Sequence, residues 1–238
     1  MRKYLFILAA LLPLTLAAAD LPDGSAGAKP EKEIFAASFA RGRWSMRDFI
    51  LVKSPRFPMN GAFEQRDDHI VNRVPAGKTP EELERSAAPY CALVLDRAIS
   101  GGMTVSSRMS FDYRMAPLIV LAPELGRSAD GRHLEFREHL ELVLHDRGLN
   151  VWHHLYANGR PSWVKRAWLT ANFAPKTVHD LSVTVENKDK GPRLIIRCGG
   201  HEFGCRLPDN FIDKPLYPGV IACEGVNRFY DFRVTRPE

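Results

Sequence analysis

Hydrophobic and polar side chains alternate with a period of two along most of the chain, a pattern typical of strands with one buried face. In the segment MTVSSRMSFDY at 103–113, Val105 and Met109 share one face while Thr104 and Arg108 lie on the other. Similar runs lie at 34–39, 48–52, 69–72, 91–96, 118–121, 181–186, 194–198 and 229–234. Clusters of Gly, Pro, Asn and Asp separate the runs, so the sequence predicts many strands joined by turns.

One helix is predicted, over the segment TPEELERSA at 79–87. Thr79 can cap its first turn, Pro80 fits the first helical position, and acidic residues fill that turn. Many strands and a single short helix predict an all-β chain folded as an antiparallel sandwich of two sheets.

The most informative segment is HLELVLHDRGLNVWHHLY at 139–156, where two alternating runs flank a short turn. If Arg147 and Gly148 form that turn, the strands pair antiparallel with Asp146 opposite Leu149. One face is then mostly aliphatic and belongs against the core, with the pairs Leu140–Leu155, Leu142–His153 and Leu144–Val151. The other face is polar and aromatic, with the pairs His139–Tyr156, Glu141–His154, Val143–Trp152 and His145–Asn150.

This polar face carries the mixture of side chains that a carbohydrate site needs. Sugar rings stack their C–H faces on Trp and Tyr, while their hydroxyls take hydrogen bonds from amide, imidazole and carboxylate groups. An ordinary solvated face, or a face covered by a loop, is the alternative. The predicted substrate-binding residues are His139, His145, Asn150, Trp152 and Tyr156.

A reaction on this face would be hydrolysis or elimination at a glycosidic bond. The predicted catalytic residues are Glu141, as general acid or base, and His154 beside it.

The N-terminus has the pattern of a secretory signal peptide at 1–19. Arg2 and Lys3 precede an apolar run, which is too short to span a membrane and ends in small residues before Asp20. We therefore expect a polar lead-in at 20–32, one domain at 33–238, and a periplasmic or secreted product that is not inserted in a membrane.

The charge balance gives no indication of a nucleic-acid partner. The whole chain has a net charge of +5, and removal of Arg2 and Lys3 leaves 31 basic against 28 acidic residues, or +3. Because the basic residues are scattered among acidic ones, we expect no nucleic-acid binding.

Four cysteines lie in a chain that is expected to reach an oxidising compartment. They are Cys91, Cys198, Cys205 and Cys223, and three of them fall near the C-terminus. This distribution favours at least one disulfide among the C-terminal strands, while the pairing stays open and free buried thiols are the alternative.

Five of the eight histidines lie between His133 and His154, so a metal site has to be considered. Glu141 and His154 could supply two ligands, but neither H-E-x-x-H nor another closely spaced zinc pattern occurs. The spacing therefore predicts no metal site and no cofactor.

The closing part of the chain resembles a known superfamily. Its segments VHDLSVTVENKDKGPRLIIRCGGHEFGC and YPGVIACEGVNRFYDFRV are similar to the closing half of concanavalin A-like lectin/glucanase domains, including the laminin-G-like and 3-keto-disaccharide-hydrolase (family-16-like) groups. The matching residues of two characteristic strands are Gly219, Val220 and Ile221, followed by Phe229, Tyr230, Asp231, Phe232 and Val234.

This resemblance implies an antiparallel two-sheet jelly roll with one short helix, whose concave side is the usual carbohydrate platform. Structural calcium in a loop is frequent in such families. Retaining glucanases of the superfamily carry an E-x-D-x-E strand motif, and no such motif occurs here. Glu138 and Glu141 are three residues apart, so on a strand they point to opposite faces. A second acidic patch, formed by Glu64, Asp67 and Asp68, is interpreted as a solvated turn.

The sequence thus leaves three function classes open. The first is an exported carbohydrate-binding or carbohydrate-processing jelly roll whose partner is an oligo- or polysaccharide. The second is a non-catalytic envelope or interaction module, and the third is a metal-dependent hydrolase.

Overall fold

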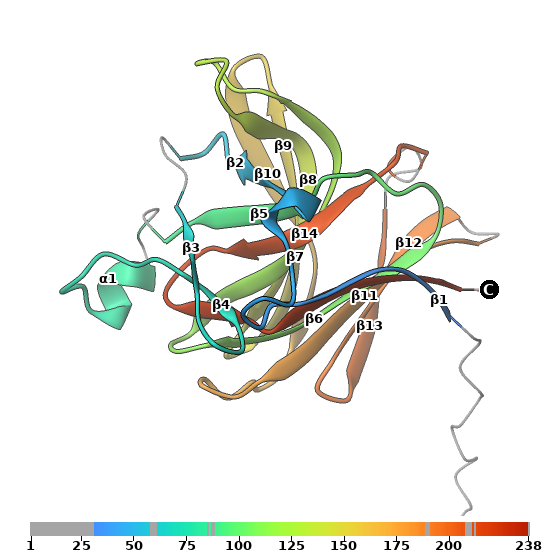
Figure 1. Ribbon diagram of the computed structural model, residues 1–238. Helices are drawn as coiled ribbons and strands as arrows, with labels where there is room; N and C mark the ends of the chain where they lie inside the picture. The colour runs from blue at the N-terminus through green and yellow to red at the C-terminus, as the bar shows by residue number, and fades with distance from the viewer. Residues whose placement is uncertain are drawn as a thin grey trace, which may run out of the picture.

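The computed structural model describes residues 31–57, 61–84, 86, 89–188, 191–207, 211 and 213–237. In this part of the chain two sheets pack face to face, with one short α-helix at the periphery (Figure 1). The predicted signal peptide at 1–19 and residues 20–30 of the predicted lead-in lie outside the described residues. The first strand already begins at Glu31, two residues before the expected start of the domain.

The first sheet contains nine of the described strands. Its main order is β13 (His201–Arg206), β12 (Gly191–Cys198), β11 (His179–Lys188), β6 (Met103–Phe111), β15 (Asn227–Phe229), β4 (Ile70–Asn72) and β3 (Phe63–Gln65). Two further strands, β16 (Asp231–Pro237) and β1 (Glu31–Ser38), continue from β6. The N-terminal and C-terminal strands therefore lie side by side (Figure 1).

The second sheet contains seven of the described strands. Its order is β10 (Arg160–Thr170), β9 (Gly148–Ala157), β8 (Leu134–His145), β2 (Phe49–Lys53), β5 (Cys91–Leu95), β14 (Tyr217–Ala222) and β7 (Met115–Arg127), and β7 also pairs with β8. The described chain further has a 3-10 turn, Met46–Asp48, and the helix α1, Pro80–Glu84.

The main core lies between the two sheets. Alternate residues of facing strands fill it, such as Val105 and Val183 from the first sheet and Leu121, Leu142 and Val151 from the second, all of them buried. This arrangement confirms the predicted all-β jelly-roll sandwich.

A second core lies on the outer face of the second sheet, the face turned away from the first sheet. Strands β2, β5, β14, β7 and β8 are joined in a ring, because β2 pairs in parallel with the start of β8 at Val52 and Leu134. The side chains that this curl encloses include Val94, Val120 and Phe136, none of them measurably exposed. Small residues on the same face allow the close curl: Ala92, Ala116 and Ala122.

Every predicted strand run overlaps a strand, and the predicted helix is present as α1. The Thr79 hydroxyl accepts a hydrogen bond from the Glu82 amide, and the Glu82 carboxylate accepts one from the Thr79 amide, so the two residues form a capping box. The predicted helix end at 87 lies outside the described residues. No helix in the described part of the chain has the length and apolar character that crossing a membrane requires.

The four cysteines are all free, so the prediction of a disulfide is wrong for the structure. Cys198 of β12 pairs with His201 of β13, and Cys205 of β13 pairs with Leu194 of β12. The two cysteines are therefore four positions apart along the β12–β13 ladder. That separation is about 13 Å, whereas a disulfide requires Cα atoms within about 7 Å. Cys91 and Cys223 are close in register but point to opposite faces of the second sheet.

Candidate functional site

The β8–β9 hairpin turns one residue earlier than predicted. His145 pairs with Gly148, so Asp146 and Arg147 form the turn and the cross-strand partners differ by two residues from the predicted ones. Gly148 belongs to the strand, since it pairs with His145 of β8 and Thr170 of β10. A Cβ atom at this position would lie 1.9 Å from the Leu169 carbonyl oxygen of β10, so only glycine fits. A shift of two residues leaves each side chain on its predicted face.

The aliphatic face of the hairpin packs in the main core, as predicted. Leu140, Leu142, Leu144 and Val151 are all buried there. His153 shares this face, and its Nε2 lies 2.9 Å from the Glu138 carboxylate, so Glu138 and Glu141 do lie on opposite faces.

The predicted site residues share the outer face, but the structure buries three of them. His139 is 2% exposed, Glu141 4% and His154 4%, while His145, Asn150, Trp152 and Tyr156 are half-buried. The predicted exposure of His139, Glu141 and His154 on a sugar-binding face is therefore wrong, because this part of the face is covered. Closure of the strand ring is the reason, because it brings the Phe136 ring onto His139, with 4.3 Å between ring centroids.

The three buried residues form a compact group, the His–Glu–His cluster of His139, Glu141 and His154. His139 and Glu141 alternate onto one face of β8, and His154 lies directly across from His139 on β9. Nε2 of His139 is hydrogen-bonded to Oε1 of Glu141 at 3.2 Å. Nε2 of His154 lies 3.1 Å from Oε2 of Glu141 without the alignment of a hydrogen bond, and has no other partner among the described residues.

Burial and charge act in different directions within the cluster. Burial lowers the pKa of His139, although the Glu141 carboxylate opposes that shift. Burial alone would raise the pKa of Glu141, but the neighbouring imidazoles of His154 and His139 more than offset it and lower the pKa. The cluster therefore holds an ionised carboxylate beside two stacked imidazole rings, whose centroids lie 4.7 Å apart.

A pocket of about 140 Å³ lies above the cluster. The side chains of Glu141 and His154 form part of its floor, and its other charged or aromatic lining residues are Arg56, Trp152, Trp163 and Glu224. Burial, reinforced by the negative charge of Glu84, raises the pKa of Glu224 to about 7. Two carboxyl groups with oppositely shifted pKa values thus line one pocket.

Strand β10 extends this outer face with aromatic residues that the sequence interpretation missed. Trp163 lies opposite His154 and Lys165 opposite Trp152, and a bulge after Lys165 places Trp168 opposite Asn150. Trp163 is 51% exposed and Trp168 65% exposed. We call this surface, formed by Trp152, Trp163, Lys165 and Trp168, the tryptophan face.

Cations lie against the rings of the tryptophan face. The Lys165 ammonium is 5.3 Å from the ring centroid of Trp152 and 5.6 Å from that of Trp168, and the Arg56 guanidinium is 4.7 Å from that of Trp163. Such contacts orient the indoles and keep polar donors beside them. A sequence signal was available, since WVKRAW places two tryptophans five residues apart on either side of basic residues.

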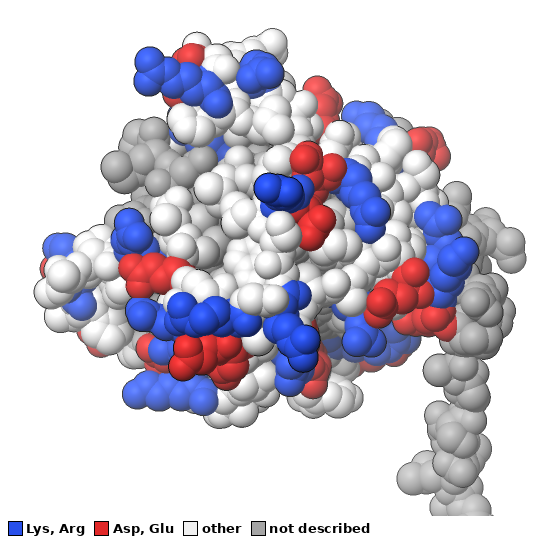
Figure 2. Space-filling view, viewed as in Figure 1, with Lys and Arg blue, Asp and Glu red and all other residues white. Residues whose placement is uncertain are grey.

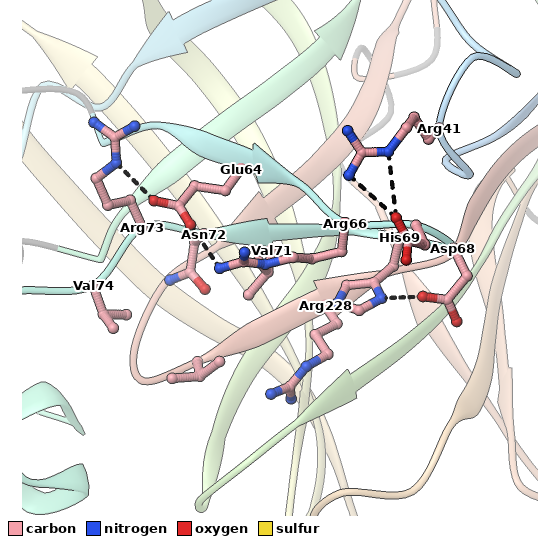
Figure 3. A pocket seen from close by; sticks show the side chains of 12 residues that line it. Arg41, Glu64, Arg66, Asp68, His69, Val71, Asn72, Arg73, Val74 and Arg228 are labelled. Atoms are coloured by element: carbon pink, nitrogen blue, oxygen red, sulfur yellow. Dashed lines mark hydrogen bonds and ion pairs between the residues drawn. The ribbon is translucent and has the colours of Figure 1, made fainter.

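A second hollow, of about 800 Å³, lies over β3 and β4 (Figure 3). Its charged side chains pair with one another, Glu64 with both Arg66 and Arg73, and Asp68 with His69. Asp67 pairs with Arg41 in the same way. The acidic patch is therefore satisfied by internal ion pairs. Asp67 and Asp68 lie at bends, in agreement with the interpretation as a turn, whereas Glu64 belongs to strand β3.

The surface as a whole mixes both signs of charge. On the face shown in Figure 2, basic and acidic side chains lie next to one another over the lower part of the molecule. Neither sign gathers into one broad area on that face.

Comparisons with known proteins identify the fold but no sequence family. No protein-family model and no curated protein matches the chain. A protein of unknown function with a galectin-like fold from Bacillus subtilis matches with a TM-score of 0.57 and 10% identity, over 88% of this chain and 100% of that one. The kappa-carrageenase of Pseudoalteromonas carrageenovora, solved with an oligotetrasaccharide of kappa-carrageenan, matches with a TM-score of 0.54 and 10% identity, over 92% and 99%.

A carbohydrate-binding module from Bacillus subtilis also matches, with a TM-score of 0.50 and 10% identity, over 79% of this chain and 94% of that one. At such low identity these likenesses show the jelly-roll fold alone. Because the three matches cover 79–92% of this chain, the similarity of fold is not confined to the C-terminal segments.

Proposed function

We propose that this chain is an exported carbohydrate-binding protein and that oligosaccharides stack on the tryptophan face. One observation carries the proposal: Trp163 and Trp168 stand largely exposed on the same face of strand β10, which is paired with β9, and Lys165 lies between them. Large exposed aromatic side chains are costly to leave in water, and sugar rings are ligands whose C–H faces fit them.

The groups around the two rings provide the polar contacts that such a ligand requires. Lys165 can donate to hydroxyl or carboxylate groups, and the half-buried Asn150, Tyr156 and His145 remain our predicted hydrogen-bonding residues at the base of the same face. The small pocket beside Trp163 would accept a single substituent of the sugar, not a whole chain, because its volume is only about 140 Å³.

Two further observations support the proposal. The proteins of similar fold include a carbohydrate-binding module and a carrageenase, which are named for carbohydrate recognition. The charged and apolar segments before Asp20 form the pattern of an export signal, which would bring the chain to extracellular glycans. Turnover by Glu141 and His154 remains a prediction, and binding does not depend on it.

The test is a glycan array followed by titration calorimetry on the glycan that binds best. Trp163→Ala and Trp168→Ala should each weaken binding by about five- to thirtyfold, because each removes a stacking contact worth about 1–2 kcal/mol. Val164→Ala is the matched control, since Val164 is 47% exposed on the opposite face of the same strand. It should bind as the wild type does.

Trp152→Ala is a poorer probe, because its ring packs against the second core. We expect this variant to lower the melting temperature, whereas the exposed tryptophan variants should leave it nearly unchanged. Absence of any glycan ligand, or equal affinity for wild type and both exposed tryptophan variants, would refute the proposal and favour an interaction module for protein partners.

A further inference from the structure

We propose that the His–Glu–His cluster binds one divalent transition-metal ion, of the chemical class of zinc, beneath the pocket next to Trp163. The inference rests on the three side chains alone and is independent of carbohydrate binding.

The separations of the donor atoms suit one small ion. Each residue of the cluster offers one ligand atom, and these three atoms all lie within 4.8 Å of one another. The carboxylate oxygens of Glu141 are 3.2 Å from Nε2 of His139 and 3.1 Å from Nε2 of His154. Zinc bonds of about 2.0–2.1 Å in a tetrahedral arrangement place donors about 3–4 Å apart, so small rotations of the side chains would complete the site.

The second observation is an unpartnered nitrogen aimed into the cluster. Nε2 of His154 is fully buried and makes no hydrogen bond within the described chain, although the Glu141 carboxylate is 3.1 Å away. A buried polar atom without a hydrogen-bond partner destabilises the fold unless a ligand or ion satisfies it. A buried imidazole nitrogen close to a carboxylate oxygen, with no hydrogen bond aligned between them, is the arrangement expected of two ligands around one cation.

The types of donor select the class of metal. Two imidazole nitrogens and one carboxylate oxygen suit zinc and other first-row transition metals, whereas calcium and magnesium prefer oxygen ligands throughout. Three protein ligands leave coordination positions open. Because Glu141 and His154 also line the pocket, those positions would be reached from it.

The arrangement also explains why spacing along the chain gives no zinc motif. His139 and Glu141 come from β8, and His154 is supplied by the register of β9. The ligands therefore meet across two paired strands, where no local pattern such as H-E-x-x-H is required.

The test is equilibrium dialysis of the untagged protein against Zn²⁺, with metal analysis, together with Co²⁺ absorption spectroscopy. The wild type should bind one zinc ion per chain and give a Co²⁺ visible band. Glu141→Gln and His154→Gln, which keep the side-chain volume closely, should weaken zinc binding by at least about tenfold and lose the band. His133→Ala is the matched control, because His133 is half-exposed and pairs with Asp130 outside the cluster. It should behave as the wild type does.

Circular dichroism identifies variants that do not fold. If a variant does not fold, the zinc binding and Co²⁺ band of the wild type alone test the proposal. The proposal is overturned if the wild type binds no zinc and gives no Co²⁺ band, or if folded Glu141→Gln and His154→Gln retain both. Trp163→Ala should keep its zinc, so failure of the sugar proposal and failure of this one are distinguishable.

Discussion

Two glutamates illustrate how the local environment sets the state of identical side chains. Glu141 and Glu224 line the same pocket, yet their pKa values are shifted in opposite directions. The imidazoles around Glu141 hold it ionised, whereas burial and the charge of Glu84 keep Glu224 partly protonated near neutral pH. The pocket therefore changes its charge between pH 6 and 8 through Glu224, at about its raised pKa of 7.

Glu224→Gln should stabilise the protein at pH 8 and have little effect near pH 4.5. Because the folded pKa is raised to about 7, the folded state binds more protons than the unfolded state between the two pKa values. The free energy of unfolding of the wild type therefore falls as pH rises through this window. The glutamine amide of the variant does not ionise, so the variant does not lose this stability. After allowance for solvent screening, we expect about 1 kcal/mol at pH 8, or about 2–4 °C in melting temperature.

Thermal unfolding of both proteins from pH 4.5 to pH 8 measures this difference. Glu202→Gln is the control, since Glu202 is exposed and paired with Arg197 at the surface. Its effect should stay within about 0.5 kcal/mol at pH 8. A difference between Glu224→Gln and wild type that does not grow with pH would contradict the buried position of this carboxyl group.

At the scale of elements, the hairpin and its neighbour β10 determine the surface on which the functional proposal rests. Gly148 is the point where they meet, because its backbone φ of 146° and the close approach of Leu169 both exclude a side chain. Gly159, in the β9–β10 turn, also has a positive φ, but an added Cβ would meet no atom within 4 Å. A comparison of alanine substitutions at the two positions therefore separates the cost of backbone strain from the cost of a steric clash.

Gly148→Ala should lower the free energy of unfolding by at least about 2–3 kcal/mol, whereas Gly159→Ala should cost about 1–2 kcal/mol. Only the first substitution pushes β10 away from the hairpin, so it should also weaken glycan binding on the tryptophan face. Urea denaturation and calorimetry measure the two effects. Equal stability of the two variants would show that β10 does not approach Gly148 as closely as in the structure.

The alternation of the sequence predicted the elements better than it predicted the site. It placed Leu142 in the core and Glu141 on the outer face correctly, because the two-residue period of a strand alone determines on which face each side chain lies. It did not find β10, since most of this edge strand is exposed on both faces and only Ala167 and Leu169 pack, partly buried, against the main core. It also predicted wrongly that His139 is exposed. The burial of His139 depends on a parallel pairing between β2 and β8, whose residues lie far apart in the sequence.

The whole molecule has two cores, and this arrangement sets the accessibility of each functional group. The inter-sheet core holds the sandwich together, while the second core closes the outer face except for the pocket and the tryptophan face. Within the described residues, the pocket that Glu141 and His154 line lies next to Trp152 and Trp163 of the tryptophan face. This arrangement is consistent with a binding surface next to a buried metal site.

The same packing governs the four cysteines, whose chemistry provides a test of the complete fold. Burial raises the pKa of Cys91 and of Cys198 to about 12, and it also raises those of Cys205 and Cys223. Thiolates are the reactive form, so a thiol reagent at pH 8 should react slowly with the native protein. In denaturant without reductant it should titrate four thiols per chain, and dithiothreitol should leave the melting temperature unchanged. Two or fewer thiols in denaturant, or a fall in melting temperature on reduction, would mean that the cysteines approach one another more closely than the strand register allows.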